Sequence, residues 1–300
     1  MIAYRSFGKR FGAHVAVEQL TLDVLRAETV ALLGPNGSGK TTTLKGAAGL
    51  LRPSTGQVLL GDPPRMASEP AARRACSFLP QKVAFPDALT GREVVEFYRK
   101  LRGADASRTE EVLRFASLNG AGNRAVQTYS GGMVQRLGLA VATLPEAPVL
   151  LLDEPTAALD PAGLAAFYEL VERRRRAGKT VLFTSHQLGD AERLADRVAV
   201  IVGGRLVGVF TERELAGRLA DRGSMRVRLE ALAPPFLRAA QEACPGAVED
   251  GDSILVPGTS ALRPLVLERL RSAGGVITGL TTEEGRLDRL YLELVKEAER

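Results

Sequence analysis

Short hydrophobic runs alternate with stretches of helical spacing along the first two thirds of the chain. Such short runs predict β-strands, whereas apolar residues that recur every three or four positions predict helices. The predicted helices cover Thr41–Leu50 and most of the stretch from about 85 to 144. Strands alternating with helices predict an α/β core with a mainly parallel sheet, into which the helical stretch is inserted. The predicted strands are Leu20–Leu25, Thr29–Leu33, Gln57–Leu60, Ser77–Leu79 and the runs PVLLLDE, TVLFTSH and RVAVIVGGRLV.

A different pattern begins at Met225, after a predicted linker helix at 212–224. A strand (MRVRLEAL), a helix that opens on proline (PPFLRAAQEA) and a hairpin around Asp250-Gly251 are followed by a helix (SALRPLVLERLRSAGG) and a strand at Gly275–Leu280. This β-α-β-β-α-β order predicts a small ferredoxin-like α+β domain over 225–300, which we expect to be a regulatory or partner-docking unit. A last helix is predicted from one apolar stripe: Leu287, Leu290, Tyr291 and Leu294.

Composition narrows the class of protein. The 300 residues are 45% hydrophobic, which suffices for a sizeable core, and 40 basic against 35 acidic residues give a net charge of +5. This mild excess permits contact with nucleic acid or an anionic membrane without requiring either. The longest apolar runs, Val149–Leu152 and Val198–Val202, are far shorter than the about 20 residues that span a bilayer. Because Cys76 and Cys244 have no metal-like spacing and no signal peptide is evident, we expect a cytoplasmic protein.

The stretch GPNGSGKTT matches the pattern G-x-x-x-x-G-K-[ST] and stands between a predicted strand and a predicted helix, as this motif requires. Glycines let the backbone turn tightly and approach an anion, and successive N–H groups at a helix start form a cradle for phosphates. The lysine adds positive charge, and the threonine hydroxyl after it is suited to Mg²⁺. The predicted nucleotide site therefore comprises Gly34, Pro35, Asn36, Gly37, Ser38, Gly39, Lys40, Thr41 and Thr42.

Polar side chains also follow other predicted strands. The run PVLLLDE ends in Asp153 and Glu154, and ligand-handling groups of parallel sheets gather at such strand ends. Asp153 is suited to hold Mg²⁺, and Glu154 is suited to polarise an attacking water. His186 ends TVLFTSH, where contact with a γ-phosphate competes with an ordinary structural role. Gln81 follows a further strand and carries no meaning by itself.

These motifs occur in one order: GPNGSGKTT, Gln81, YSGGM, LLLDEP, AALD and a strand-ending histidine. In content, order and spacing, residues 1 to about 210 resemble the nucleotide-binding subunits of ATP-binding-cassette (ABC) transporters. The resemblance implies a P-loop NTPase cassette over 1–211, with a RecA-like mixed sheet and a helical subdomain at about 85–144, that hydrolyses ATP with Mg²⁺. It also implies adenine stacking by Phe11, catalysis by Glu154, His186 and Gln81, Mg²⁺ contacts from Thr41, Gln81 and Asp153, a signature at Tyr129, Ser130, Gly131 and Gly132, and an inter-subunit contact by Asp160.

In such proteins two cassettes pack head to tail, and the Ser-Gly-Gly turn of one copy contacts the γ-phosphate held by the other. The Ser130 hydroxyl, the exposed N–H groups of the glycines and the helix start after them suit this role. A Ser-Gly-Gly turn can also be a simple helix cap. The usual signature, Leu-Ser-Gly-Gly-Gln, is changed here to Tyr129 and Met133 at its ends. We expect an active homodimer, since Ser130 and Gly132 remain.

The stretch YSGGMVQRLGLA is similar to ATPases that pair with separate membrane subunits of the ABC-2 exporter type. Together with FPDALTGREVVEFYRKLRGA, it is also similar to the ATPase that serves nitrous-oxide-reductase copper-site maturation, although the sequence has no cluster of soft ligands for copper. The implied partner is an integral membrane permease, met near EFYRKLR at the inner face of the cell membrane, and no nucleic-acid partner is expected.

Two alternatives stay open at this point. One is a soluble ABC ATPase that acts on a scaffold or on nucleic acid, like the iron–sulfur-assembly type, and the other is a plain phosphate-loop kinase. The basic run ERRRRAGK is expected to be a solvated helix face in either case rather than a nucleic-acid site.

Overall fold

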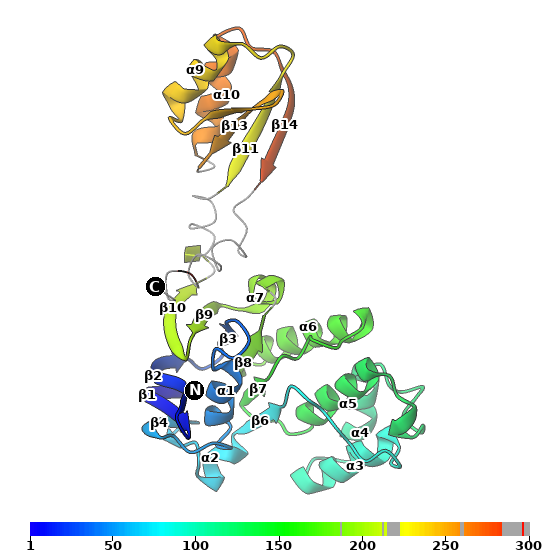
Figure 1. The fold of residues 1–300 in the computed structure, drawn as a ribbon. Coiled ribbons are helices and arrows are strands. Elements are labelled where there is room, and N and C mark those ends of the chain that lie inside the picture. The colour runs from blue at the N-terminus through cyan, green and yellow to red at the C-terminus, as the bar shows by residue number, and fades with distance from the viewer. Residues whose placement is uncertain (187, 212, 215–222, 259–260, 284–295, 297–300) are drawn as a thin grey trace. The chain divides into compact units, whose positions relative to one another are not determined.

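The computed structural model describes residues 1–186, 188–211, 213–214, 223–258, 261–283 and 296 (Figure 1). They form two compact units, one from Met1 to Val209 and one that begins at Phe210. Each unit is built around hydrophobic clusters of its own. Most of the predicted linker helix at 212–224 lies outside the described residues.

The central sheet of the first unit consists of β3 (Thr29–Leu33), β6 (Cys76–Leu79), β7 (Val149–Leu152), β8 (Thr180–Ser185), β9 (Arg197–Val202) and β10 (Arg205–Thr211). Their order is β10-β9-β3-β8-β7-β6, and the four pairs from β9 to β6 are parallel, as predicted for the core. Every residue of β3, β7 and β8 is buried, which is typical of central parallel strands covered on both faces.

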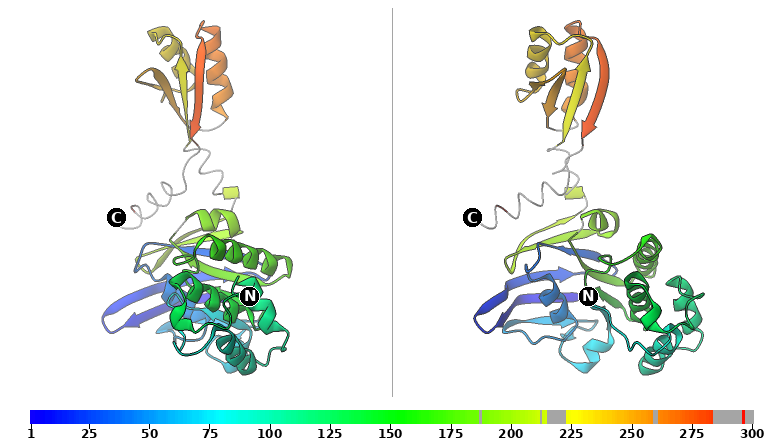
Figure 2. Two further views of the ribbon diagram at one scale, coloured as in Figure 1. Left: turned by 90° about the vertical axis from the view of Figure 1, so that its right-hand side faces the viewer. Right: turned by 45° about the vertical axis from the view of Figure 1, so that its right-hand side comes forward.

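A second, antiparallel sheet contains β1 (Ile2–Phe11), β2 (His14–Val24), β4 (Thr55–Leu60) and β5 (Arg65–Met66) in the order β2-β1-β4-β5. Helix α1 (Lys40–Ala47) contacts strands of both sheets (Figure 2). Strand β1 was not predicted, and β2 begins well before the predicted start at Leu20. The physical reason is that register shifts interrupt the pairing of β1 with β2, so apolar residues do not alternate cleanly along either strand.

The helices predicted between about 85 and 144 are α3 (Gly91–Arg102), α4 (Arg108–Phe115) and α5 (Gly131–Thr143), which lie together (Figure 1). They share one hydrophobic cluster, and α5 contacts β6. Thr90 and Glu93 start α3 with a capping box, in which each side chain accepts a hydrogen bond from the other residue's main-chain N–H. A short helix, α2 (Pro70–Arg74), precedes β6, and a 3₁₀ turn at Val126–Thr128 precedes α5.

Two further helices follow the central strands: α6 (Pro161–Arg176) after β7 and α7 (Leu188–Leu194) after β8. The last turn of α6 holds the basic run that we expected to be solvated. Arg174 of this run is only 6% exposed, its Nη1 donates to the Ala147 carbonyl at 2.9 Å, and burial lowers its pKa. The prediction of a solvated face is therefore wrong at Arg174, because the end of α6 packs on the turn that leads into β7.

The second unit contains β11 (Ser224–Leu229), α9 (Pro234–Ala243), β12 (Val248–Asp250), β13 (Ser253–Pro257), α10 (Leu262–Ser272) and β14 (Ile277–Glu283). Its sheet has the order β12-β13-β11-β14, with all neighbours antiparallel. The predicted hairpin turns at Gly251-Asp252, where Gly251 has a φ of 65°. The predicted final stripe from Leu287 to Leu294 lies outside the described residues. Cys76 in the first unit and Cys244 here are free and buried.

Candidate nucleotide site

The glycine-rich loop lies between β3 and α1, and its glycines are required by geometry. Gly37 and Gly39 have φ angles of 80° and 102°, which side chains rarely adopt, and Gly39 is the N-cap of α1. A β-carbon on Gly34 would lie 2.2 Å from the Ile201 carbonyl oxygen. The loop can therefore present its main-chain N–H groups at the start of α1, where an anion is favoured.

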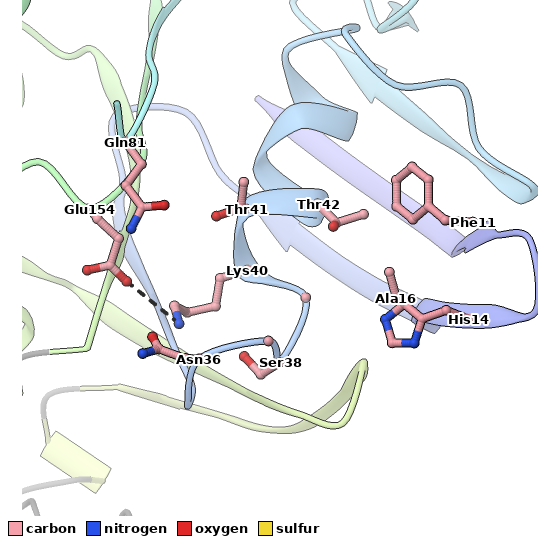
Figure 3. Close-up of a pocket in the computed structure, with 12 residues that line it drawn as sticks. Phe11, His14, Ala16, Asn36, Ser38, Lys40, Thr41, Thr42, Gln81 and Glu154 are labelled. Atoms are coloured by element: carbon pink, nitrogen blue, oxygen red, sulfur yellow. Dashed lines mark ion pairs between the residues drawn. The ribbon is translucent and has the colours of Figure 1, made fainter. Parts of the chain in front are cut away.

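The loop forms one wall of a pocket of about 440 Å³ (Figure 3). Gln81 and Glu154 point toward Lys40 from one side of the loop, while Phe11 and His14 lie beyond Thr42 on the other. The pocket thus brings together phosphate-loop residues, strand-end polar groups and the β1–β2 hairpin. Its lining residues are Phe11, His14, Ala16, Asn36, Gly37, Ser38, Gly39, Lys40, Thr41, Thr42, Gln81 and Glu154.

Lys40 is 6% exposed and is held inside the loop. Its Nζ donates to the carbonyl oxygens of Gly34 at 2.8 Å and Pro35 at 3.1 Å, and it lies 3.6 Å from Glu154 Oε1. Burial lowers the pKa of Lys40, and the neighbouring Glu154 carboxylate opposes that change. The ammonium group is therefore positioned by the chain itself at the mouth of the N–H cradle.

Asp153 is 1% exposed and lies directly behind α1. Its Oδ1 accepts hydrogen bonds from the hydroxyls of Thr41 at 3.0 Å and Thr184 at 2.8 Å. Its Oδ2 is buried and has no hydrogen-bond partner among the described residues. Burial raises the pKa of Asp153, and the two hydroxyl hydrogen bonds oppose that change.

Glu154 adopts an unusual backbone conformation, with a φ of 47°. A non-glycine residue in this region is strained, and such strain persists only where surrounding contacts enforce it. Here the Glu154 N–H donates to Thr184 Oγ1 at 2.7 Å, and Glu154 Oε2 lies 2.5 Å from His186 Nδ1. The strained turn therefore directs the carboxylate toward both Lys40 and His186.

The Ser-Gly-Gly turn does not line this pocket. Ser130 is the N-cap of α5 and accepts a hydrogen bond from the Met133 N–H at 3.2 Å. A β-carbon on Gly131 would meet nothing within 4 Å, whereas one on Gly132 would lie 3.2 Å from the Ala158 carbonyl oxygen. The Tyr129 hydroxyl donates to the Ala121 carbonyl at 2.8 Å. The structure thus places the predicted Ser-Gly-Gly turn apart from the residues that line the pocket.

Asp160 does not line the pocket. It is the N-cap of α6, where its Oδ1 accepts a hydrogen bond from the Gly163 N–H at 2.8 Å. Its Oδ2 accepts from Arg136 Nη2 at 3.2 Å, and Arg136 also donates to the carbonyls of Ala116 and Ser117. Asp160 therefore links the start of α6 to the second turn of α5 within one chain.

Comparison with known proteins identifies the family. The family model described as "ABC transporter" matches residues 17–157. The daunorubicin resistance ATP-binding protein DrrA3 of Streptomyces coeruleorubidus is 34% identical over 95% of this chain and 93% of its own length. The chain belongs to the ABC transporter family. The doxorubicin resistance ATP-binding protein DrrA of Mycobacterium tuberculosis is 32% identical over 97% of this chain and 91% of its own length. The Nod factor export ATP-binding protein I of Cupriavidus metallidurans is 34% identical over 72% of each chain.

Solved structures agree with this membership. The ATP-binding cassette MJ0796, in a dimeric post-hydrolysis state bound to ADP and Pi, is 26% identical with a TM-score of 0.65, over 71% of this chain and 99% of that chain. A second dimeric structure of MJ0796 has a TM-score of 0.66 at 27% identity and the same coverage. This chain is accordingly an ATP-hydrolysing cassette of the ABC transporter family. No helix in the described part of the chain is long and apolar enough to cross a membrane.

Three residues at or beside the nucleotide pocket of this ABC cassette were not predicted from the sequence. His14 and Ala16 line the pocket because the β1–β2 hairpin pairs Phe11 with His14, which places these residues beside α1. Thr184 contacts both Asp153 and the main chain of Glu154 from the neighbouring strand. The available signal for Thr184 was a threonine at the end of a predicted strand, two positions before His186, whereas nothing local in the sequence marks the hairpin.

Proposed function

We propose that this ABC cassette binds and hydrolyses ATP as the energising subunit of a separate, membrane-spanning exporter permease. The observation that carries the proposal is the pairing of an assembled nucleotide pocket with relatives, similar over nearly their whole length, whose names describe drug-resistance ATP-binding proteins. The protein would then work at the cytoplasmic face of the membrane through the permease.

The arrangement of the pocket supports a different role for each of its residues in ATP hydrolysis. The loop N–H groups and Lys40 would bind the β- and γ-phosphates, and the exposed ring of Phe11 would stack on adenine. Glu154 would accept a proton from the attacking water, since it is an ionisable oxygen base beside Lys40. His186, 2.5 Å from Glu154, would orient that carboxylate and sense the γ-phosphate, and Gln81 would help to position the water.

The residues present fit Mg²⁺, which prefers hard oxygen ligands. The buried Asp153 Oδ2 has no hydrogen-bond partner among the described residues, and the Thr41 hydroxyl bonds to the same carboxylate. Thr41, Asp153 and Gln81 would hold the ion, which when bound would neutralise phosphate charge. Binding a cation there would also relieve the cost of burying the Asp153 carboxylate.

A head-to-tail dimer would complete the site. Ser130, Gly131 and Gly132 lie outside the chain's own pocket, and a β-carbon on Gly131 would meet open space. In the dimer this turn would contact the γ-phosphate of the partner copy, with Tyr129 bracing it and Asp160 near the interface. MJ0796, which is similar to this chain, is described as a dimeric cassette. We expect a homodimer, because this chain supplies both halves.

The permease would meet helix α3. Phe97 and Leu101, one helical turn apart, are 58% and 65% exposed, which is unusual for large apolar side chains of a charged helix. The names of the relatives favour an exported apolar or amphipathic compound over copper-enzyme maturation. The described residues contain no group of three or more His, Cys, Asp or Glu side chains that could hold a metal ion. Nucleic acid, which is bound mainly through its phosphate charges, would not match this apolar patch.

For the second unit we propose a ferredoxin-like fold with a regulatory or docking role over 225–300. The β-α-β-β-α-β order of its elements and the strand order β12-β13-β11-β14 support that assignment.

The test is capture of the partner. Tagged Glu154→Gln protein, trapped with Mg·ATP in its native cell, should co-purify from the membrane fraction with a polytopic membrane protein in fixed stoichiometry. The Phe97→Ser/Leu101→Ser double variant is the matched control and should lose that protein while still binding ATP. Recovery only in the soluble fraction, with a scaffold or nucleic acid, would contradict the exporter assignment. Co-purification of a copper-handling protein would favour a role in copper-enzyme maturation over export of a drug-like compound.

A further inference from the structure

Asp190 on α7 is a buried carboxylate that has no role in the proposed chemistry. It is 3% exposed. Its Oδ2 accepts a hydrogen bond from the Thr156 hydroxyl at 2.7 Å and lies 3.4 Å from the Ser185 hydroxyl, and its Oδ1 accepts from the Tyr168 hydroxyl at 2.8 Å. A buried carboxylate is costly unless its oxygens are hydrogen-bonded, and hydroxyl donors satisfy both oxygens here.

Two of these donors belong to segments that carry the proposed catalytic groups, and the third lies on α6. Ser185 ends β8 and directly precedes His186. Thr156 stands two residues after Glu154, in the turn that follows β7. Tyr168 lies on α6, the helix that Asp160 caps. The Asp190 carboxylate therefore joins α7 to three segments: the end of β8 before His186, the turn after Glu154, and helix α6.

Sheet pairing alone does not hold these segments together. The parallel pairing of β7 with β8 ends at Leu152 and Phe183, before either polar group is reached. Beyond that point Glu154 has a φ of 47°, and the 2.5 Å separation of His186 Nδ1 from Glu154 Oε2 depends on contacts outside the sheet.

We propose that Asp190 is a positioning residue, which keeps His186 against Glu154 by tying together the segments that follow β7 and β8. The proposal rests on the catalytic roles proposed above for those two residues. It requires Asp190 to act on the rate of hydrolysis and not on the phosphate cradle, which it does not touch. A misplaced catalytic group lowers kcat even when substrate binding is intact.

The test uses the full-length protein and measures kcat per ATP-binding site together with KM for ATP. Asp190→Ala should lower kcat by about tenfold or more, while KM changes by less than about twofold. In a His186→Ala background, Asp190→Ala should cause no further loss, because both substitutions then remove one function. Thr156→Val, which deletes only the hydrogen bond to the Glu154 segment, should shift kcat in the same direction and provides a folded variant if Asp190→Ala does not fold.

Asp196 offers the matched control. It follows α7 and accepts hydrogen bonds from the Thr29 N–H at 2.8 Å and Arg175 at 2.6 Å, outside the pocket. Asp196→Asn should lower the melting temperature and leave kcat per site unchanged. The proposal is wrong if Asp190→Ala and Thr156→Val behave like this control, or if the losses from Asp190→Ala and His186→Ala multiply. Full activity of His186→Ala and Glu154→Gln would instead overturn the catalytic roles assigned under the proposed function.

Discussion

Two glycine-rich turns start helices in this protein, and they have opposite surroundings. The turn before α1 is completed by its own chain, since Lys40 is buried and Thr41 bonds to Asp153. The turn before α5 is open, since Ser130 caps its own helix and a β-carbon on Gly131 would meet nothing within 4 Å. Similar backbone chemistry therefore has two uses. In the proposed function, the turn before α1 would bind phosphate within one chain, whereas the turn before α5 would contact phosphate only in a dimer.

The largest effect is expected from the closed turn's neighbour Glu154. Glu154→Gln should lower kcat by about 10²- to 10⁴-fold, the range of a lost general base, while ATP binding persists. Steady-state ATPase rates and equilibrium ATP binding measure the two quantities. Glu146→Gln changes an exposed carboxylate that pairs with Arg108 and should have no effect on the rate. Undiminished turnover of Glu154→Gln would reject its assignment as the base.

The open turn is tested by Gly131→Ala. The added methyl group has room in the monomer, and alanine favours a helix more than glycine does, so folding should be unaffected. At a dimer interface the same methyl would obstruct the phosphate, and hydrolysis should fall by about tenfold with loss of the ATP-dependent dimer. Light scattering with and without Mg·ATP measures the dimer. Gly120→Ala, at a glycine with equally open space, is the control and should retain both dimer and rate.

Arg136 tests what holds the open turn in place. This arginine is 8% exposed and bridges Asp160 with the carbonyls of Ala116 and Ser117. Arg136→Ala would leave buried acceptors unpaired and should cost about 2 kcal/mol of folding free energy. Denaturant unfolding measures that loss. Arg114→Ala, another arginine of this helical region, should cost far less, and equal losses would show that Arg136 has no special role.

The stability of the folded protein should depend on the protonation of Asp153, the carboxylate that contacts the turn before α1. Burial raises the folded-state pKa of Asp153 above its ordinary value of about 3.9, so folding binds a proton in this range and stability falls as pH rises through the raised pKa. Without nucleotide at neutral pH, Asp153→Asn should melt above the wild type, and the gap should shrink toward about pH 4. Mg·ATP should raise the melting temperature of the wild type more than that of Asp153→Asn, because the variant lacks one of the proposed ligands of the ion. If the difference in melting temperature between Asp153→Asn and the wild type were the same at every pH, the raised pKa of Asp153 would be contradicted.

The smallest effect is expected at Lys9. Its Nζ lies 5.1 Å from the centre of the Phe11 ring and donates to the Arg52 carbonyl at 2.9 Å. An exposed cation–π contact of this kind contributes about 0.5–1 kcal/mol. Lys9→Gln should therefore weaken ATP binding by about two- to fivefold with kcat unchanged. Calorimetric titration with ATP measures this, and Lys100→Gln on α3 serves as the control that should bind ATP normally.

The candidate site could be predicted where its chemistry is local. Gly34–Thr42 follows from glycine conformation and helix-start electrostatics within nine positions of sequence. His14 could not be predicted, because its place in the pocket depends on the hairpin register that pairs it with Phe11. The burial of Arg174 was missed for a similar reason, since only packing of α6 on the turn before β7 removes it from water.

The sequence by itself determined the short-range features of this protein: the alternation of strands and helices, the phosphate loop and the order of motifs that marks the family. Tertiary structure alone decided that Thr41, Asp153 and Thr184 meet, that one glycine-rich turn is closed and the other open, and that Asp190 joins the segments behind Glu154 and His186. Backbone preferences act over a few residues and can be seen in the sequence. These contacts join residues between 31 and 112 positions apart, and they depend on the order of strands in the whole sheet, which no single segment encodes.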